Sequence, residues 1–278
     1  MAAILLPTLN EEGSIRTVLE GIPGAYRDGV LVIDGGSTDN TVAIVEEMGF
    51  PVIPQQGKGL GCAIVTGIEA TSDEMIVAID TDGSHEPRQI PEFIAKLEEG
   101  YDLVVASRYS DGPPDAHMFS PKRRSTSDDD TALRAFGNRS FTYLCQLLFG
   151  LPVHDVLNGY KAWRRSIHER VVIRGQQQDY DIDLLLQTHL EGYRVTDLGS
   201  VEYPRIAGVS KLSVPKHGTM ILANILKHYG RRLAGRTRRF PGLLRTGSTP
   251  ARKSPRRSPR RTPMGATPGQ RRSRISEA

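Results

Sequence analysis

The stretch Ile76-Val77-Ala78-Ile79-Asp80-Thr81-Asp82-Gly83 decides the fold, because an apolar run ends there in two carboxylates. Residues 75–79 show no polar alternation, which predicts a strand buried on both faces of a mostly parallel sheet. Ligands of such sheets bind beyond the carboxyl ends of the strands. We therefore expect Asp80 and Asp82 to lie at a binding site.

The two carboxylates are the first candidate metal ligands. Neighbouring carboxylates repel each other unless a cation neutralises them. A small cluster of oxygen ligands, expected to have no Cys or His nearby, suits Mg²⁺ or Mn²⁺ shared with the phosphates of a nucleotide. Taken alone, Asp80 and Asp82 are better explained as caps of the turn into a helix that begins near Pro87, and the rest of the chain reverses this preference.

Apolar strands alternate with helical patterns through the first 106 residues. The expected strands are 3–6, 30–34, 52–53, 75–79 and 103–106, and the expected helices are 14–20, 38–48, 60–70 and 87–98. This alternation predicts an α/β fold with right-handed crossovers and helices on both faces of a mostly parallel sheet.

Polar loops follow the first two strands at residues 7–12 and 34–39. We expect them to meet Asp80 and Asp82 along one sheet edge, with Ser37 or Thr38 capping a helix whose N-terminus favours an anion. Each loop alone is compatible with ordinary turn chemistry. Their convergence at one edge favours a nucleotide site.

The second half predicts further elements around charged side chains. We expect a long loop over 110–130, and then a helix at 131–149, a turn and strand over 155–163, a helix that begins at Tyr180, and a strand pair over 194–201. Arg205 and Lys211 flank a flexible glycine, so they could hold phosphate. The alternative is that both are solvated surface residues.

The charge of the chain is divided between an acidic body and a basic end. Residues 1–226 carry 20 Lys and Arg against 31 Asp and Glu, a net of −11, whereas residues 227–278 carry 16 against 1, a net of +15. A helical pattern over 216–233 is amphipathic and could pack on the sheet or lie in a membrane interface. The Pro-, Ser- and Arg-rich stretch after Arg236 predicts disorder. Such a segment is attracted to an anionic membrane surface or, without sequence preference, to nucleic acid.

Cysteine and hydropathy indicate the compartment. Cys62 and Cys145 are the only cysteines and lie in apolar helical patterns, so we expect core residues in a reducing environment. The N-terminus has no signal-peptide pattern, and no apolar run is long enough to span a membrane. The chain is expected to be cytoplasmic and peripherally associated with the membrane.

Taken together, the motifs resemble the family 2 glycosyltransferases with the GT-A fold, and within them the dolichyl-phosphate mannose and glucose synthases. The resemblance covers residues 3–213. The motifs that carry it are Pro7-Thr8-Leu9-Asn10-Glu11, Val32-Ile33-Asp34-Gly35-Gly36-Ser37-Thr38-Asp39, Asp80-Thr81-Asp82, Ser107-Arg108-Tyr109, Asp155 with Asn158-Gly159-Tyr160, and Arg205 with Gly208-Val209-Ser210-Lys211-Leu212.

The resemblance implies an inverting transfer of a hexose from a nucleotide-sugar, GDP-mannose or UDP-glucose, to a polyprenyl or dolichyl phosphate. It implies that a nucleoside and its diphosphate lie against Pro7, Leu9, Glu11, Ile33, Asp34, Asp80 and Thr81, with Asp80 and Asp82 holding Mg²⁺ or Mn²⁺. The catalytic set that it implies is Asp82, Arg108, Asp181, Arg205 and Lys211. In this set the cations hold phosphates, and Asp181 matches a carboxylate that orients the sugar. An anionic lipid phosphate needs no strong general base.

The chain departs from the family at two positions of the site. Gly35 stands where the family has a second Asp, which removes one nucleoside contact, and Ser84 stands where some mannose synthases have Gln. We expect a GT-A domain at 1–213, the amphipathic helix at 214–235 and a disordered tail at 236–278. Two alternatives remain open, namely a glycosyltransferase with a soluble acceptor and a non-enzymatic protein that binds nucleic acid through its basic tail.

Overall fold

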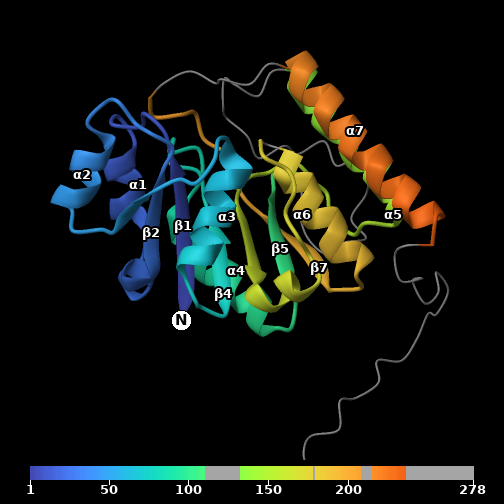
Figure 1. The fold of residues 1–278 in the computed structure, drawn as a ribbon, viewed down its shortest axis with the longest axis horizontal. Coiled ribbons are helices and arrows are strands. Elements are labelled where there is room, and N and C mark those ends of the chain that lie inside the picture. Colours follow the sequence, from blue (N-terminus) through green and yellow to red (C-terminus); the bar gives the residue numbers. More distant parts are fainter. Residues whose placement is uncertain (110–131, 178, 208–213, 236–278) are drawn as a thin grey trace, which may run out of the picture. The chain divides into compact units, whose positions relative to one another are not determined.

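The strands form one mixed sheet in the order β3-β2-β1-β4-β6-β5-β7 (Figure 1). Strand β6 runs antiparallel to its neighbours β4 and β5, and the other neighbouring pairs are parallel. The strands are β1 (Ala2–Thr8), β2 (Val30–Asp34), β3 (Val52–Pro54), β4 (Met75–Ala78), β5 (Leu103–Ser107), β6 (Lys161–Arg164) and β7 (Val195–Gly199).

The computed structural model of the chain describes residues 1–109, 132–177, 179–207 and 214–235. These residues lie in one unit that spans Met1–Phe240. The α-helices among them are α1 (Ile15–Gly21), α2 (Thr41–Glu47), α3 (Leu60–Ala70), α4 (Ile90–Glu98), α5 (Ala132–Phe149), α6 (Asp179–Leu190) and α7 (Val214–Leu233). Short 3₁₀ helices occur at η1 (Gly24–Gly29), η2 (Pro87–Gln89) and η3 (Arg165–Glu169).

Alternate residues of the central strands feed two hydrophobic cores, one on each face of the sheet. In β1, Ala3 and Leu5 join a core with α3, α5, α6 and α7, whereas Ile4 and Leu6 join a core with α1, α2 and α4. Strand residues project alternately to opposite faces, so an unbroken apolar run is what a doubly covered strand requires. The predicted α/β fold is confirmed.

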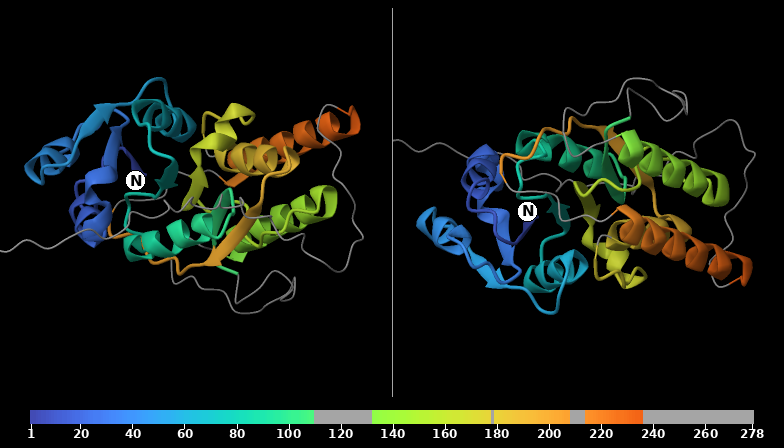
Figure 2. Two further views of the ribbon diagram at one scale, coloured as in Figure 1. Left: turned by 90° about the horizontal axis from the view of Figure 1, so that it is seen from below. Right: turned by 90° about the horizontal axis from the view of Figure 1, so that it is seen from above.

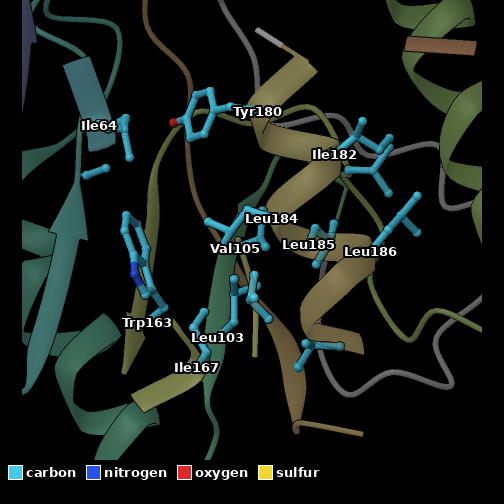
Figure 3. Packing of buried hydrophobic residues seen from close by; sticks show 14 of the residues in the cluster. Ile64, Leu103, Val105, Trp163, Ile167, Tyr180, Ile182, Leu184, Leu185 and Leu186 are labelled. Carbon is cyan, nitrogen blue, oxygen red and sulfur yellow. The ribbon is translucent and has the colours of Figure 1, made fainter. Parts of the chain in front are cut away.

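Helix α6 supplies much of the first core. Leu184 lies close to Val105 of β5, whereas Ile182 and Leu186 lie on the opposite side of the helix (Figure 3). Trp163 of β6 is fully buried in the same core. Cys145 is also buried there, but Cys62 is only partly buried, so only one of the two cysteines is the core residue that was expected.

Two local expectations are wrong. Helix α2 begins at Thr41, three residues later than predicted, and neither Ser37 nor Thr38 caps it. The Asp39 carboxylate instead accepts hydrogen bonds from the backbone N–H and the hydroxyl of Thr41. The strand pair expected over 194–201 is the single strand β7, which lies parallel to β5 at the sheet edge.

Helix α7 packs against both α6 and α5 through only part of its apolar stripe. Ile221 and Ile225 are buried, whereas Leu222, Leu226 and Leu233 are exposed. In the part of the chain that the structure describes, no helix is long and apolar enough to cross a membrane. The predicted loop at 110–130, Lys211 and the tail after Arg236 lie outside the described residues, and the predicted domain boundaries stay predictions.

Candidate active site

The loop after β1 and the Asp80-Thr81-Asp82 stretch after β4 lie together at the carboxyl ends of these strands. The two strands are parallel neighbours, and the Thr81 hydroxyl donates a hydrogen bond to the backbone carbonyl of Pro7 at 3.1 Å. Asp82 accepts the Ser84 N–H at 2.9 Å, which forms a tight turn through Gly83 at φ +79°. The Asp80-Thr81-Asp82 stretch is therefore fixed against the loop that follows β1.

The loop after β2 is joined to the loop after β1 by hydrogen bonds. The Asn10 N–H donates to the Ser37 hydroxyl at 2.9 Å, and the Asn10 side-chain oxygen accepts from the Thr38 N–H at 2.8 Å. Asp34 accepts the N–H groups of Gly36 and Ser37 at 3.0 and 3.1 Å. The expected convergence of these loops on one edge is present.

The predicted nucleoside contacts are not equally accessible. Leu9 is exposed and Pro7, Glu11 and Asp34 are partly buried, all near the loops after β1 and β2. Ile33 is fully buried in the core below α3, so its side chain is part of the core rather than of the surface at this edge.

Asp80 lies in a charged cluster that sequence reasoning did not foresee. Its carboxylate is 3.4 Å from Nε2 of His85, a ring that is buried and whose Nδ1 has no hydrogen-bond partner among the described residues. The expectation of a site without a nearby His is therefore wrong. The backbone of Gly159 also presses against Asp80, since a Cβ added there would lie 2.8 Å from Oδ2.

Lys161 is the most deeply buried cation of this cluster. Strand β6 is antiparallel, so its first residue lies at the edge where the parallel strands end. The Lys161 ammonium donates hydrogen bonds to the Asp181 carboxylate, in the first turn of α6, and to the Asn158 carbonyl. Lys161 is fully buried and Asp181 nearly so. A charged residue at the start of the apolar strand Ala162-Trp163 was the signal that could have identified it.

The pKa shifts in the cluster follow from burial and neighbouring charge. Desolvation alone would raise the pKa of Asp80, but the hydrogen bond to His85 and the charges of His85, Arg205 and Lys161 lower it. The pKa of His85 is raised, because its contacts with Asp80 outweigh desolvation. Burial raises the pKa of Asp181, and Lys161 only partly opposes this.

Asp82 is paired with Arg205. Their side chains are 2.7 Å apart, and the Ile206 N–H donates to the Asp82 carbonyl at 3.0 Å. Ile206 also covers Gly83, where an added Cβ would lie 2.4 Å from Ile206 Cδ1. The segment that carries Arg205 thus lies directly over the carboxylate pair.

Arg108 is held in a buried ion-pair network. Its guanidinium forms two hydrogen bonds with Asp155, at 2.7 and 3.0 Å, and a third with Glu202 at 2.9 Å. Its pKa is raised because the charges of Asp155 and Glu202 outweigh the desolvation that would lower it. The structure therefore gives Arg108 a clear role in joining β5 to the loops before β6 and after β7. Asp155 and Glu202 were not recognised as its partners from the sequence.

The fold defines a GT-A-like α/β protein, with the carboxylate pair Asp80 and Asp82 in the loop directly after β4. Residues 3–172 match the family described as glycosyl transferase family 2, which is more than half of the chain. The chain belongs to this family, and the predicted membership is confirmed.

Several proteins are similar over most of the chain. An uncharacterized glycosyltransferase of Mycobacterium tuberculosis is 31% identical over 218 residues, which is 78% of this chain and 92% of that protein. A dolichyl-phosphate hexose transferase of Haloferax volcanii is 28% identical and covers 81% of this chain and 92% of its own length. A polyprenol monophosphomannose synthase of Mycolicibacterium smegmatis is 27% identical, over 76% of this chain and 80% of that protein.

Solved structures agree on the fold. Glucosyl-3-phosphoglycerate synthase of Mycobacterium tuberculosis, crystallised with Mn²⁺, uridine diphosphate and phosphoglyceric acid, superposes with a TM-score of 0.64. It is 21% identical and covers 83% of this chain and 78% of its own. At this identity the likeness supports the GT-A-like fold alone.

Proposed function

We propose that this chain is an inverting hexosyltransferase that moves a sugar from a nucleotide-sugar, GDP-mannose or UDP-glucose, to a polyprenyl or dolichyl phosphate at the cytosolic face of a membrane. The observation that carries the proposal is the Asp80 and Asp82 pair at the carboxyl end of β4, with Arg205 against it. The acceptor is supported by the names of the similar proteins of Haloferax volcanii and Mycolicibacterium smegmatis.

The carboxylate oxygens at this edge of the sheet fit a divalent cation that is shared with a diphosphate. Mg²⁺ is usually held by one or two carboxylates together with substrate phosphates. Asp80 and Asp82 supply two carboxylates, and the described residues contain no group of three or more His, Cys, Asp or Glu that would form a complete site. Bound there, Mg²⁺ or Mn²⁺ would stabilise the charge that the diphosphate gains as it leaves.

Other residues near this edge of the sheet are our candidates for contacts with the nucleoside and the phosphates. Pro7, Leu9, Glu11 and Asp34 would contact the nucleoside, while Thr81 fixes the metal loop against Pro7. Two anionic phosphates must be held together, which requires cations that are already in place. Arg205 and Lys211 are our candidates for these contacts. The Arg108 guanidinium is engaged by Asp155 and Glu202. Its proposed role is therefore indirect: it holds the segment around Glu202, which leads to Arg205.

Asp181 is proposed to orient the sugar rather than to abstract a proton. Its carboxylate is bound to Lys161 in a buried pair. A lipid monophosphate is already an anionic nucleophile near pH 7, so the reaction needs no strong general base. The chemistry then rests on holding the two substrates in line for displacement.

The test is turnover of a panel of GDP- and UDP-sugars with Mg²⁺ or Mn²⁺, with and without dolichyl phosphate. We expect nucleotide release that depends on the lipid and is abolished in Asp82→Ala. Asp28→Ala, at an exposed position in η1, serves as the matched control and should keep full activity.

Other outcomes would overturn the proposal. Release that requires a soluble acceptor would show a family 2 enzyme with a different substrate. Turnover that survives Asp82→Ala would remove the carboxylate pair from the mechanism. The proposal also includes peripheral membrane association aided by the basic tail, and replacing Arg256, Arg257, Arg260 and Arg261 by Gln in the full chain should weaken binding to anionic vesicles.

A further inference from the structure

The loop after β3 is joined to the loops after β1 and β2. Strand β3 forms one edge of the sheet with β2 and β1 next to it, at the end of the molecule away from α5 and α7 (Figure 2). The Gln55 N–H, directly after β3, donates to the Asp34 carbonyl at 2.8 Å, and the Gly35 N–H donates to the Thr8 carbonyl at 2.8 Å. Hydrogen bonds therefore connect the carboxyl ends of these three strands.

The Gln55 side chain lies against the position that Gly35 leaves open. A Cβ added at Gly35 would be 3.2 Å from Oε1 of Gln55, 3.3 Å from the Thr8 carbonyl oxygen and 3.5 Å from Cβ of Leu9. A larger side chain at position 35 would press on the Gln55 oxygen. The glycine, which stands where the family has a second Asp, thus leaves room for Oε1 of Gln55 beside Leu9, one of the proposed nucleoside contacts.

Two carbonyl groups fix the orientation of the Gln55 amide. Its Nε2 donates to the Gly59 carbonyl at 2.9 Å and to the Gly57 carbonyl at 3.3 Å. Because carbonyl oxygens only accept hydrogen bonds, the amide nitrogen must face them and the amide oxygen must face Gly35. Gly57 and Gly59 have φ angles of +84° and +97°, which favour glycine and allow the loop to turn back onto Gln55. Gln55 therefore presents a hydrogen-bond acceptor to the loops after β1 and β2.

The backbone donors around this position are already used. The N–H groups of Gly36 and Ser37 donate to the Asp34 carboxylate at 3.0 and 3.1 Å. The N–H groups of Gly35 and Gln55 donate to carbonyl groups. A carboxylate offers about four acceptor sites, so Asp34 can accept further hydrogen bonds. What a ligand would meet between these loops is therefore two acceptors, namely the Asp34 carboxylate and Oε1 of Gln55.

Nucleobases differ in how well they can meet two acceptors. Guanine carries two adjacent donors, N1–H and the 2-amino group, whereas uracil carries a single N3–H between the acceptors O2 and O4. Guanine can pair with both protein oxygens, but uracil would set one of its carbonyl oxygens against an acceptor. We propose that Gln55 determines which base the donor carries and selects guanine, so that the sugar arrives on GDP. This inference rests on the proposed function, in which GDP and UDP are both candidates.

Calorimetric titration of the full chain with GDP, IDP and UDP at fixed Mg²⁺ tests the proposal. IDP lacks the 2-amino group and leaves one acceptor unpaired, so it should bind about tenfold more weakly than GDP, and UDP at least as weakly as IDP. In Gln55→Leu, which removes the acceptor, the affinities for GDP and UDP should come within about threefold of each other. Gln56→Leu changes the exposed neighbouring glutamine and should keep the wild-type preference.

A second variant separates base recognition from support of the loop. Gln55→Glu loses the hydrogen bonds to Gly57 and Gly59 but keeps an acceptor oxygen, so it should retain the preference for GDP. An equal loss of preference in Gln55→Glu and Gln55→Leu would show that Gln55 only shapes the loop, and would overturn the inference. Tighter binding of UDP than of GDP by the wild type would also overturn it, even with lipid-dependent turnover. Selection of GDP that depends on Gln55, without turnover of any GDP-sugar onto dolichyl phosphate, would leave the inference standing and overturn the proposed function.

Discussion

The Arg205 guanidinium lies 2.7 Å from the Asp82 carboxylate and takes a position that a divalent cation would compete for. Asp82 is almost fully buried, whereas Arg205 keeps about a quarter of its side-chain surface exposed. The guanidinium neutralises the buried carboxylate. A metal that binds Asp82 would compete with Arg205, which would then be placed to meet the proposed phosphate contact.

Arg205→Ala should tighten binding of Mn²⁺ alone and slow turnover. Loss of the competing cation removes a partly exposed ion pair of about 1 kcal/mol, so we expect the Kd for Mn²⁺ to fall roughly fivefold. The same change removes the proposed phosphate contact of Arg205 and should lower kcat. Calorimetric titration of Mn²⁺ without donor, together with steady-state kinetics, measures both effects.

Arg88→Ala is the matched control for Arg205→Ala, since Arg88 is an exposed arginine in η2, after the loop that carries Asp80 and Asp82. It should leave both the Kd for Mn²⁺ and kcat unchanged. Weaker Mn²⁺ binding in Arg205→Ala would show that the arginine supports the metal site instead of competing with it.

Gly159→Ala should weaken metal activation without unfolding the protein. The added Cβ would lie 2.8 Å from Oδ2 and 3.2 Å from Oδ1 of Asp80, so the carboxylate must move. Displacing groups that orient metal ligands typically costs about 10- to 100-fold in metal affinity. We expect a rise of that order in the Mn²⁺ concentration that gives half-maximal turnover.

The control for Gly159→Ala is Gly24→Ala in η1, where an added Cβ meets nothing within 4 Å. Its metal activation should match that of the wild type. If Gly159→Ala keeps wild-type metal activation, Asp80 does not need its observed position to bind the ion.

The sequence allowed the sheet and the position of Asp80 and Asp82 at its carboxyl edge to be predicted, because both depend on local pattern. An apolar run that ends in Asp80 and Asp82 identifies a strand and its carboxyl end regardless of what lies beside it. The partner of Arg108 could not be found this way, because Asp155 is 47 residues away and reaches it only through the order of β5 and β6. The helical period likewise revealed the apolar stripe of α7, but not that packing against α5 and α6 leaves Leu222, Leu226 and Leu233 exposed.

Lys161→Met should destabilise the fold and stop turnover. The variant leaves the Asp181 carboxylate buried without its cation, and breaking a buried pair in this way costs about 3–5 kcal/mol. Replacing both partners, in Lys161→Met with Asp181→Leu, removes the unpaired charge and should restore most of the free energy of unfolding measured in urea. Turnover should not return, because Lys161 also contributes charge beside Asp80. If the double variant were as active as the wild type, Lys161 and Asp181 would contribute to stability only and not to turnover.

The acid limit of stability should depend on Asp183. Burial alone would raise the pKa of this carboxyl, but the hydrogen bond from His228, the N–H groups of Arg174 and Gly175 and the His228 charge lower it below the ordinary value of 3.8. A depressed pKa in the folded state contributes stability that is present above the ordinary value and lost as pH falls through the folded pKa. Asp183→Asn should therefore be less stable at pH 6 and lose less stability between about pH 4 and 2.5. Urea unfolding across this range measures the two slopes, with Asp28→Asn, at an exposed position, as the control. Parallel slopes for wild type and Asp183→Asn would show that the attachment of α7 to α6 through His228 does not set the acid limit.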